Sequence, residues 1–160
     1  MELDIVGYRF SNEELGLLAD IFGYEKIASL QVEVPDFLGR TEAEHSLEQT
    51  GNLINMGTTY NVDEITALLI NAVCKADRYI TVKSDNVCFV LYQCDQLVIL
   101  AQKCANGYVL KPERSKEMLF DEIGELVSKS KDGFVEVWCS VSNETSKENA
   151  DELICLFKTL

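Results

Sequence analysis

Residues 78–111 read RYITVKSDNVCFVLYQCDQLVILAQKCANGYVLK, and this stretch decides the fold. Four short runs rich in β-branched and aromatic residues follow one another, separated by turn-forming pairs such as Asp85-Asn86 and Asn106-Gly107. Asn-Gly favours a type I′ hairpin turn, because that turn needs positive φ at both central residues. The stretch predicts an antiparallel meander with strands Arg78–Ser84, Val87–Cys94, Gln96–Lys103 and Tyr108–Lys111.

The two central strands of this meander are apolar on both sides. Phe89 and Leu91 point to one face, whereas Val90 and Tyr92 point to the other. Antiparallel sheets commonly bury one face and expose the other. We therefore expect both faces to be covered, either by the chain's own helices or, on one side, by a partner protein.

Helix-start signals organise the residues before the meander. Ser-x-x-Glu and Thr-x-x-Glu patterns form capping boxes, in which a side-chain oxygen and a glutamate satisfy the first free N–H groups. They predict helices from Ser11 to Gly23, from Thr41 to Gly51, and over 62–76 behind an imperfect Asn61–Glu64 cap. Alternation of apolar and polar residues predicts a strand over Ala28–Val34, which Pro35 ends.

The residues after the meander add a helix over 114–128, a strand Phe134–Val141, and a last helix capped by Thr145 with Glu148. The order is α-β-α-α-β-β-β-β-α-β-α. Strands grouped in a meander with flanking helices predict an α+β fold. The 160 residues contain no Gly/Ser-rich linker, so we expect a single domain over residues 1–160.

The chain is strongly acidic, with 27 Asp and Glu against 14 Lys and Arg and a formal net charge of −13. This charge repels the phosphates of nucleic acids and anionic membranes, and favours basic or neutral protein surfaces. The first residues, MELDIVGYRF, lack the basic start of a signal peptide, and no apolar run is long enough to span a bilayer. We expect a cytoplasmic protein without membrane insertion.

The chemistry-bearing residues predict no catalytic site, metal or cofactor. Six cysteines, at 74, 88, 94, 104, 139 and 155, form no C-x-x-C pair, and we expect reduced thiols, mostly in apolar segments. His45 is the only histidine and lies in a charged segment typical of a solvated surface. An enzyme that uses dispersed carboxylates is the alternative, because such pairs need not be close in the chain.

The strand Phe134–Val141 offers the best candidate for a binding surface. One face is apolar, whereas the other combines Phe134 and Trp138 with Glu136. Aromatic residues among polar ones are typical of protein interfaces. With two aromatic residues of the meander, the predicted partner-binding residues are Phe134, Glu136, Trp138, Phe89 and Tyr92. The alternative is that Trp138 belongs to the core.

Three segments resemble the EspG-like family of chaperones associated with ESX (type VII) secretion: FSNEELGLLADIFGYEKIASL at 10–30, GRTEAEHSLEQTGNLI at 39–54 and NVDEITALLINAVCKADRYITV at 61–82. The likeness continues through LVILAQ at 97–102 and the helix that ends near residue 128. The chain looks shorter than actinobacterial members, so it resembles a short Gram-positive relative.

The resemblance implies a non-enzymatic, cytosolic chaperone that needs no cofactor. Such proteins bind a helical secreted effector or a WXG100-like or LXG-like protein, cover its apolar tip and keep it competent for export. The alternatives are an immunity protein or antitoxin that occludes a basic toxin, and a type III-like secretion chaperone. The sequence leaves the partner and the oligomeric state open.

Overall fold

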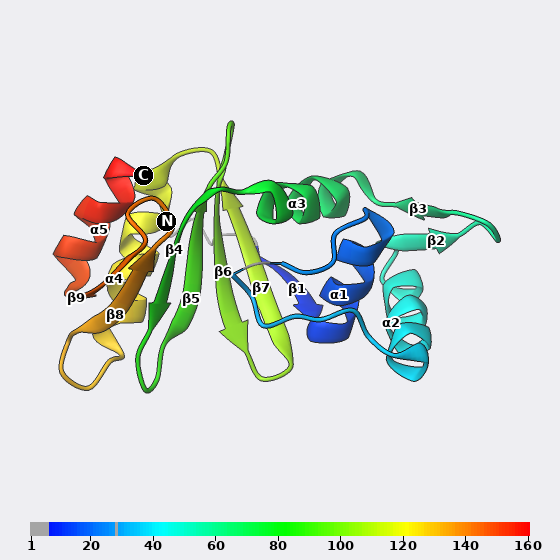
Figure 1. Ribbon diagram of the computed structural model, residues 1–160, viewed down its shortest axis with the longest axis horizontal. Coiled ribbons are helices and arrows are strands. Elements are labelled where there is room, and N and C mark those ends of the chain that lie inside the picture. The colour runs from blue at the N-terminus through cyan, green and yellow to red at the C-terminus, as the bar shows by residue number, and fades with distance from the viewer. Residues whose placement is uncertain (1–6, 28) are drawn as a thin grey trace, which may run out of the picture. The chain divides into compact units, whose positions relative to one another are not determined.

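The computed structural model describes residues 7–27 and 29–160. Its described residues form an α+β fold with a seven-stranded antiparallel sheet in the order β1-β7-β6-β5-β4-β8-β9 and a separate hairpin β2-β3, which confirms the predicted fold class (Figure 1). Contacts divide the chain into two compact units. The helical unit comprises the described part of Arg9–Lys75 with Cys104–Tyr108. The sheet unit comprises Ala76–Lys103, Val109–Leu160 and the described residues before Arg9. The single domain over 1–160 stays a prediction.

The predicted meander is confirmed as β4 (Arg78–Lys83), β5 (Cys88–Gln93), β6 (Val98–Cys104) and β7 (Gly107–Glu113). Cross-strand pairs such as Val82↔Phe89 and Leu91↔Leu100 set its register. The predicted type I′ turn is wrong, because neither Asn106 nor Gly107 has positive φ. Gly107 instead permits a close approach within the helical unit, since a Cβ there would lie 2.0 Å from the carbonyl oxygen of Phe10.

Two edge strands were not predicted, β1 (Tyr8–Ser11) and β9 (Glu144–Glu148). The predicted strand over 134–141 is confirmed as β8 (Val135–Cys139), and β9 pairs with it in the register Trp138↔Thr145. The proposed Thr145–Glu148 cap is therefore wrong. Asn149 forms the capping box with Glu152 and starts α5 (Ala150–Thr159), because its carboxamide is placed directly before the apolar helix pattern.

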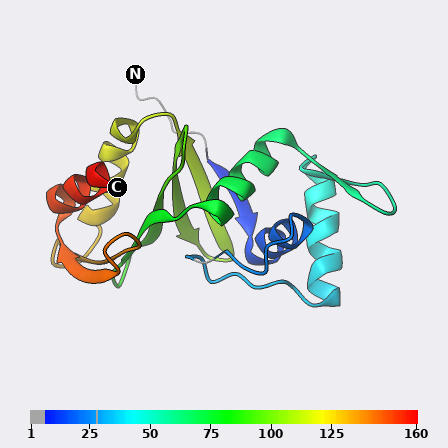
Figure 2. The same cartoon turned by 45° about the horizontal axis from the view of Figure 1, so that its top comes forward.

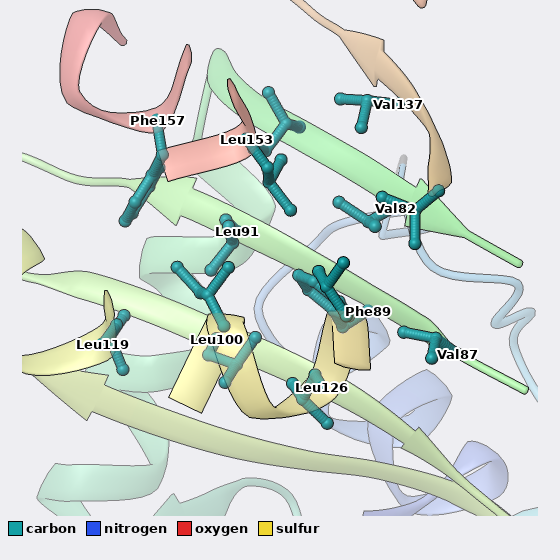
Figure 3. Close-up of a cluster of buried hydrophobic side chains, with 14 of the residues drawn as sticks. Val82, Val87, Phe89, Leu91, Leu100, Leu119, Leu126, Val137, Leu153 and Phe157 are labelled. Atoms are coloured by element: carbon teal, nitrogen blue, oxygen red, sulfur yellow. The ribbon is translucent and has the colours of Figure 1, made fainter. Parts of the chain in front are cut away.

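One face of the sheet is covered by α5 and α4 (Phe120–Ser128), as Figures 1 and 2 show. A 3₁₀ turn, η1 (Lys116–Leu119), leads into α4, so the predicted helix over 114–128 begins later than expected. Leu119, Ile123, Leu153 and Phe157 are buried against Phe89 and other inward residues of the strands (Figure 3). This cluster is an apolar core of the sheet unit, and it buries Phe89 and Leu91 of β5 and the apolar side of β8.

The helical unit contains α1 (Asn12–Ile21), α2 (Phe37–Gln49) and α3 (Glu64–Lys75). The Ser11–Glu14 capping box is confirmed at α1, and the helix ends before Gly23, which has φ +83°. The Thr41–Glu44 capping box is wrong. The N-cap of α2 lies five residues earlier, at Asp36, whose side chain accepts a hydrogen bond from the N–H of Gly39 at 2.8 Å.

A hairpin that the sequence did not predict connects α2 to α3. Its strands are β2 (Leu53–Asn55) and β3 (Tyr60–Val62). Asn61 pairs within this hairpin, so its predicted role as a helix cap is wrong. Asp63 performs that role, since its carboxylate accepts from the backbone N–H of Thr66 at 3.2 Å.

The predicted strand over Ala28–Val34 is wrong for residues 29–34, and Ala28 lies outside the described residues. The segment contributes one isolated bridge, between Lys26 and Glu33. Leu30 and Val32 are buried and Gln31 between them is exposed, as the alternation predicts, but Val34 is 41% exposed, so the predicted apolar face does not continue to the end of the segment. No helix in residues 7–27 and 29–160 combines the length and apolar character needed to cross a bilayer.

Candidate functional site

The five predicted partner-binding residues occupy very different environments. Glu136 is exposed, Phe134 is 40% exposed and Trp138 is half-buried on the outward side of β8. Phe89 and Tyr92 are fully buried, so their assignment to a binding surface is wrong. The reason is that β5 is covered on both faces, which removes the side chains of both aromatic residues from solvent.

Trp138 belongs to a row of aromatic rings that leads from the surface into the sheet unit. Its ring centroid lies 5.7 Å from that of Tyr79, at an interplanar angle of 47°. Tyr79 in turn lies 5.7 Å from Tyr92. Tilted contacts at this distance are favourable for aromatic pairs. Trp138 is therefore partly a core residue, as the alternative reading expected.

The β8–β9 face, defined here as Phe134, Glu136, Trp138, Thr145 and Lys147, carries most of the predicted surface. The ammonium group of Lys147 lies 5.2 Å from the Phe134 ring centroid and 3.5 Å from a carboxylate oxygen of Asp132. The backbone N–H of Phe134 donates to Asp132 and lowers the pKa of that carboxyl, with a smaller contribution from Lys147. A hollow of about 460 Å³ is lined by residues 134–136 of one strand end and 145–147 of the other.

Sequence analysis missed a second and larger group of exposed apolar residues. Most of the large hydrophobic side chains that are exposed in the described chain belong to the helical unit. They are Val34, Phe37, Leu38, Ile54, Met56, Ile65 and Leu68. Single exposed apolar residues are ordinary, but a group on one compact unit points to an interaction surface.

Four of these residues define the hairpin–α3 surface: Ile54, Met56, Ile65 and Leu68. Ile54 and Met56 lie on the β2–β3 hairpin, and Met56, near its tip, is 62% exposed. Ile65 and Leu68 lie one turn apart on α3 and are exposed, at the edge of the apolar stripe whose members Leu69 and Val73 are buried. The sequence predicts the helix over 62–76 that contains these residues, but it does not separate the buried from the exposed ones.

Hydrogen bonds from α2 hold the hairpin in place. The Glu44 carboxylate accepts from the Asn55 side chain at 2.5 Å and from the Tyr60 hydroxyl at 2.8 Å. The bond to Glu44 is the main cause that raises the pKa of Tyr60, with desolvation adding to it. The tip turns at Gly57, which has φ +91° and donates its N–H to Asn55. The exposed position of Ile54 and Met56 is therefore supported by ordered contacts.

The remaining three exposed apolar residues define the α2 corner: Val34, Phe37 and Leu38. Phe37 and Leu38 open α2 and are 82% and 71% exposed. Of the three, Val34 lines a hollow of about 440 Å³, together with Asn12, Glu13, Glu33, Pro35, Asp36 and Gly39. The first turn of α2 packs closely against Pro35, since a Cβ on Gly39 would lie 3.1 Å from the Pro35 side chain.

The titratable residues outside these surfaces are dispersed. The six cysteines are free thiols. Cys139 is buried, but Cys155 is exposed, contrary to the expectation of a mostly apolar setting. Burial raises the pKa of Cys74 and Cys94 to about 11, with Asp95 adding to the effect at Cys94. His45 is exposed on α2. In the described ranges, no group of three His, Cys, Asp or Glu side chains is placed to hold a metal ion.

Comparison of the chain with protein-family models gives no match, and comparison with curated protein sequences also gives none.

Proposed function

We propose that the protein binds another polypeptide through exposed apolar side chains of its helical unit, and acts as a cytoplasmic, non-enzymatic chaperone for helical type VII secretion substrates. The observation that carries the proposal is the hairpin–α3 surface. It presents four large apolar residues on an ordered hairpin and the helix that follows it. An apolar face of this kind is suited to the apolar side of an amphipathic helix.

The composition of the surface supports this proposal. Met56 has an unbranched, polarisable side chain that adapts to different partners, and methionine is common on surfaces that accept several ligands. A helical substrate with an exposed apolar tip aggregates unless the tip is covered. Covering it requires apolar contact area and no bond chemistry.

Co-expression with a WXG100-like or LXG-like protein, followed by gel filtration, tests the proposal. We expect the wild-type chain to co-elute with the substrate. The Ile54→Ser/Met56→Ser double variant should elute without it. Met118→Ser is the matched control, because Met118 is an exposed methionine of the sheet unit. Substrates that stay monodisperse alone and never co-elute with the wild type would refute the proposal.

The net charge of −13 favours a second candidate, an immunity protein that occludes a basic toxin. Such a complex predicts a different pattern. Its association rate falls steeply with ionic strength, because electrostatic steering is screened. It also tolerates the Ile54→Ser/Met56→Ser change, since charged rather than apolar contacts hold the toxin.

A further inference from the structure

We infer that the α2 corner is a separate docking site for a polypeptide segment that carries apolar side chains flanked by lysine or arginine. The inference rests on the proposed polypeptide-binding function and assigns a chemical class to the partner. It uses residues distinct from the hairpin–α3 surface. Val34, Phe37 and Leu38 supply the apolar contact, and the hollow that Val34 lines supplies the charge.

The rim of the hollow is acidic. Glu13, Glu33 and Asp36 line it and are exposed. Within the described part of the chain, none of the three carboxylates forms an ion pair. The nearest cation along α2, Arg40, is already bound to Asp20 at 2.6 Å. Lys26 lies opposite Glu33 in the isolated bridge without forming an ion pair among the described residues, so three carboxylates against one lysine leave the rim with a net negative charge, which favours a cationic neighbour.

A buried acceptor adds a second, independent indication. The side-chain oxygen of Asn12 is buried and has no hydrogen-bond partner in the residues that the structure describes. Asn12 also lines the hollow. A buried acceptor without a donor is costly, and rotation of the Asn12 side chain toward the hollow would allow an ammonium or guanidinium group to supply the missing donor.

An anionic ligand fits the corner poorly, although two helices begin there. The Ser11 hydroxyl and the Asp36 carboxylate already accept from N–H groups in the first turns of α1 and α2. The three rim carboxylates would repel an added negative charge. A second copy of this chain is disfavoured for the same reason, because each copy carries a net charge of −13.

Three synthetic amphipathic peptides of about 15 residues, with one shared leucine face, provide the test. Their flanking positions carry lysine, glutamine or glutamate, and binding is measured by fluorescence anisotropy. We expect each rim carboxylate to contribute a factor of about three to the affinity for the lysine peptide. The lysine peptide should therefore bind at least about tenfold more tightly than the glutamate peptide. Equal affinity for the three peptides would overturn the inference.

Variants locate the binding. Leu38→Ser should weaken the binding of the lysine peptide about tenfold, whereas Met118→Ser, at an exposed residue of the sheet unit outside both proposed surfaces, should leave it unchanged. Glu13→Gln with Glu33→Gln should reduce the preference for lysine while the glutamine peptide binds as before. If Leu38→Ser leaves binding intact, the assignment to the corner is wrong.

The two proposals fail separately. Loss of substrate co-elution with an intact lysine preference would refute the chaperone function alone. A substrate complex that depends on Ile54 and Met56, together with peptides that bind without charge preference, would refute the α2-corner site alone.

Discussion

Helix α2 contains two leucines whose replacement by alanine should differ greatly in its effect on stability. Leu47 is fully buried, whereas Leu38 is 71% exposed. Leu47→Ala removes three buried carbon groups, which at about 0.8 kcal/mol each cost about 2.4 kcal/mol. The cavity left behind brings the expected loss in the free energy of unfolding to about 3–4 kcal/mol. Leu38→Ala should change it by about 0.5 kcal/mol or less, because no core contact is lost and alanine favours the helix.

Urea unfolding followed by circular dichroism measures both variants. With a denaturant dependence of about 2 kcal/mol per molar urea, Leu47→Ala should lower the midpoint by about 1.5–2 M. Trp138, the only tryptophan, reports on the sheet unit by fluorescence. If the chain unfolds as one domain, both probes shift together. Equal midpoints for Leu47→Ala and Leu38→Ala would refute the argument from burial. A lower midpoint of Leu47→Ala by circular dichroism, with an unchanged midpoint by Trp138 fluorescence, would refute the prediction of a single domain.

Gly16→Ala should destabilise the protein, because a Cβ there would lie 2.2 Å from the carbonyl oxygen of Glu33, whereas Gly124→Ala in α4 has free space and should stabilise it by about 0.5–1 kcal/mol. Thermal unfolding separates the two, and stabilisation by both changes would contradict the close approach. Cys74 and Cys94 have pKa values raised to about 11 by burial, so the folded state favours their neutral thiols. Their contribution to stability is complete below about pH 9 and is lost as the pH rises to about 11. Urea midpoints measured from pH 8 to 11 should fall less in the Cys74→Ala/Cys94→Ala variant, and parallel profiles would contradict the assignment.

The sequence predicted the elements that have strong periodicity. The four runs of the meander and the alternation in β8 were found because a half-buried or fully buried strand needs apolar residues at defined intervals. Cap signals were less specific. Ser11 with Glu14 is a true capping box, but Thr41 lies inside a helix and Thr145 in an edge strand. Short polar patterns recur by chance. The side chains that accept hydrogen bonds from the first N–H groups of α2 and α5 are those of Asp36 and Asn149, and the two threonines have no such role.

The candidate surfaces were only partly accessible to sequence reasoning. Alternation placed Phe134 and Glu136 on the outward side of β8 correctly. It could not show that Tyr92, on the same side of its own strand, is buried, because burial there depends on contacts distant in the chain. The β2–β3 hairpin escaped notice because each of its strands is only three residues long, too short for an alternating pattern to be recognised.

The exposure of Phe37 and Leu38 follows from the phase of α2. Ala43 and Leu47 are its buried residues and define the inward side. At about 100° per residue, Leu38 lies about 140° from Ala43 around the helix axis, and Phe37 lies about 120° away in the other direction. A helix that buries Ala43 and Leu47 therefore cannot also turn these two side chains inward. Solubility alone would favour polar residues at both positions, whereas an aromatic residue and a leucine beside unpaired carboxylates are what a partner with apolar and basic groups requires.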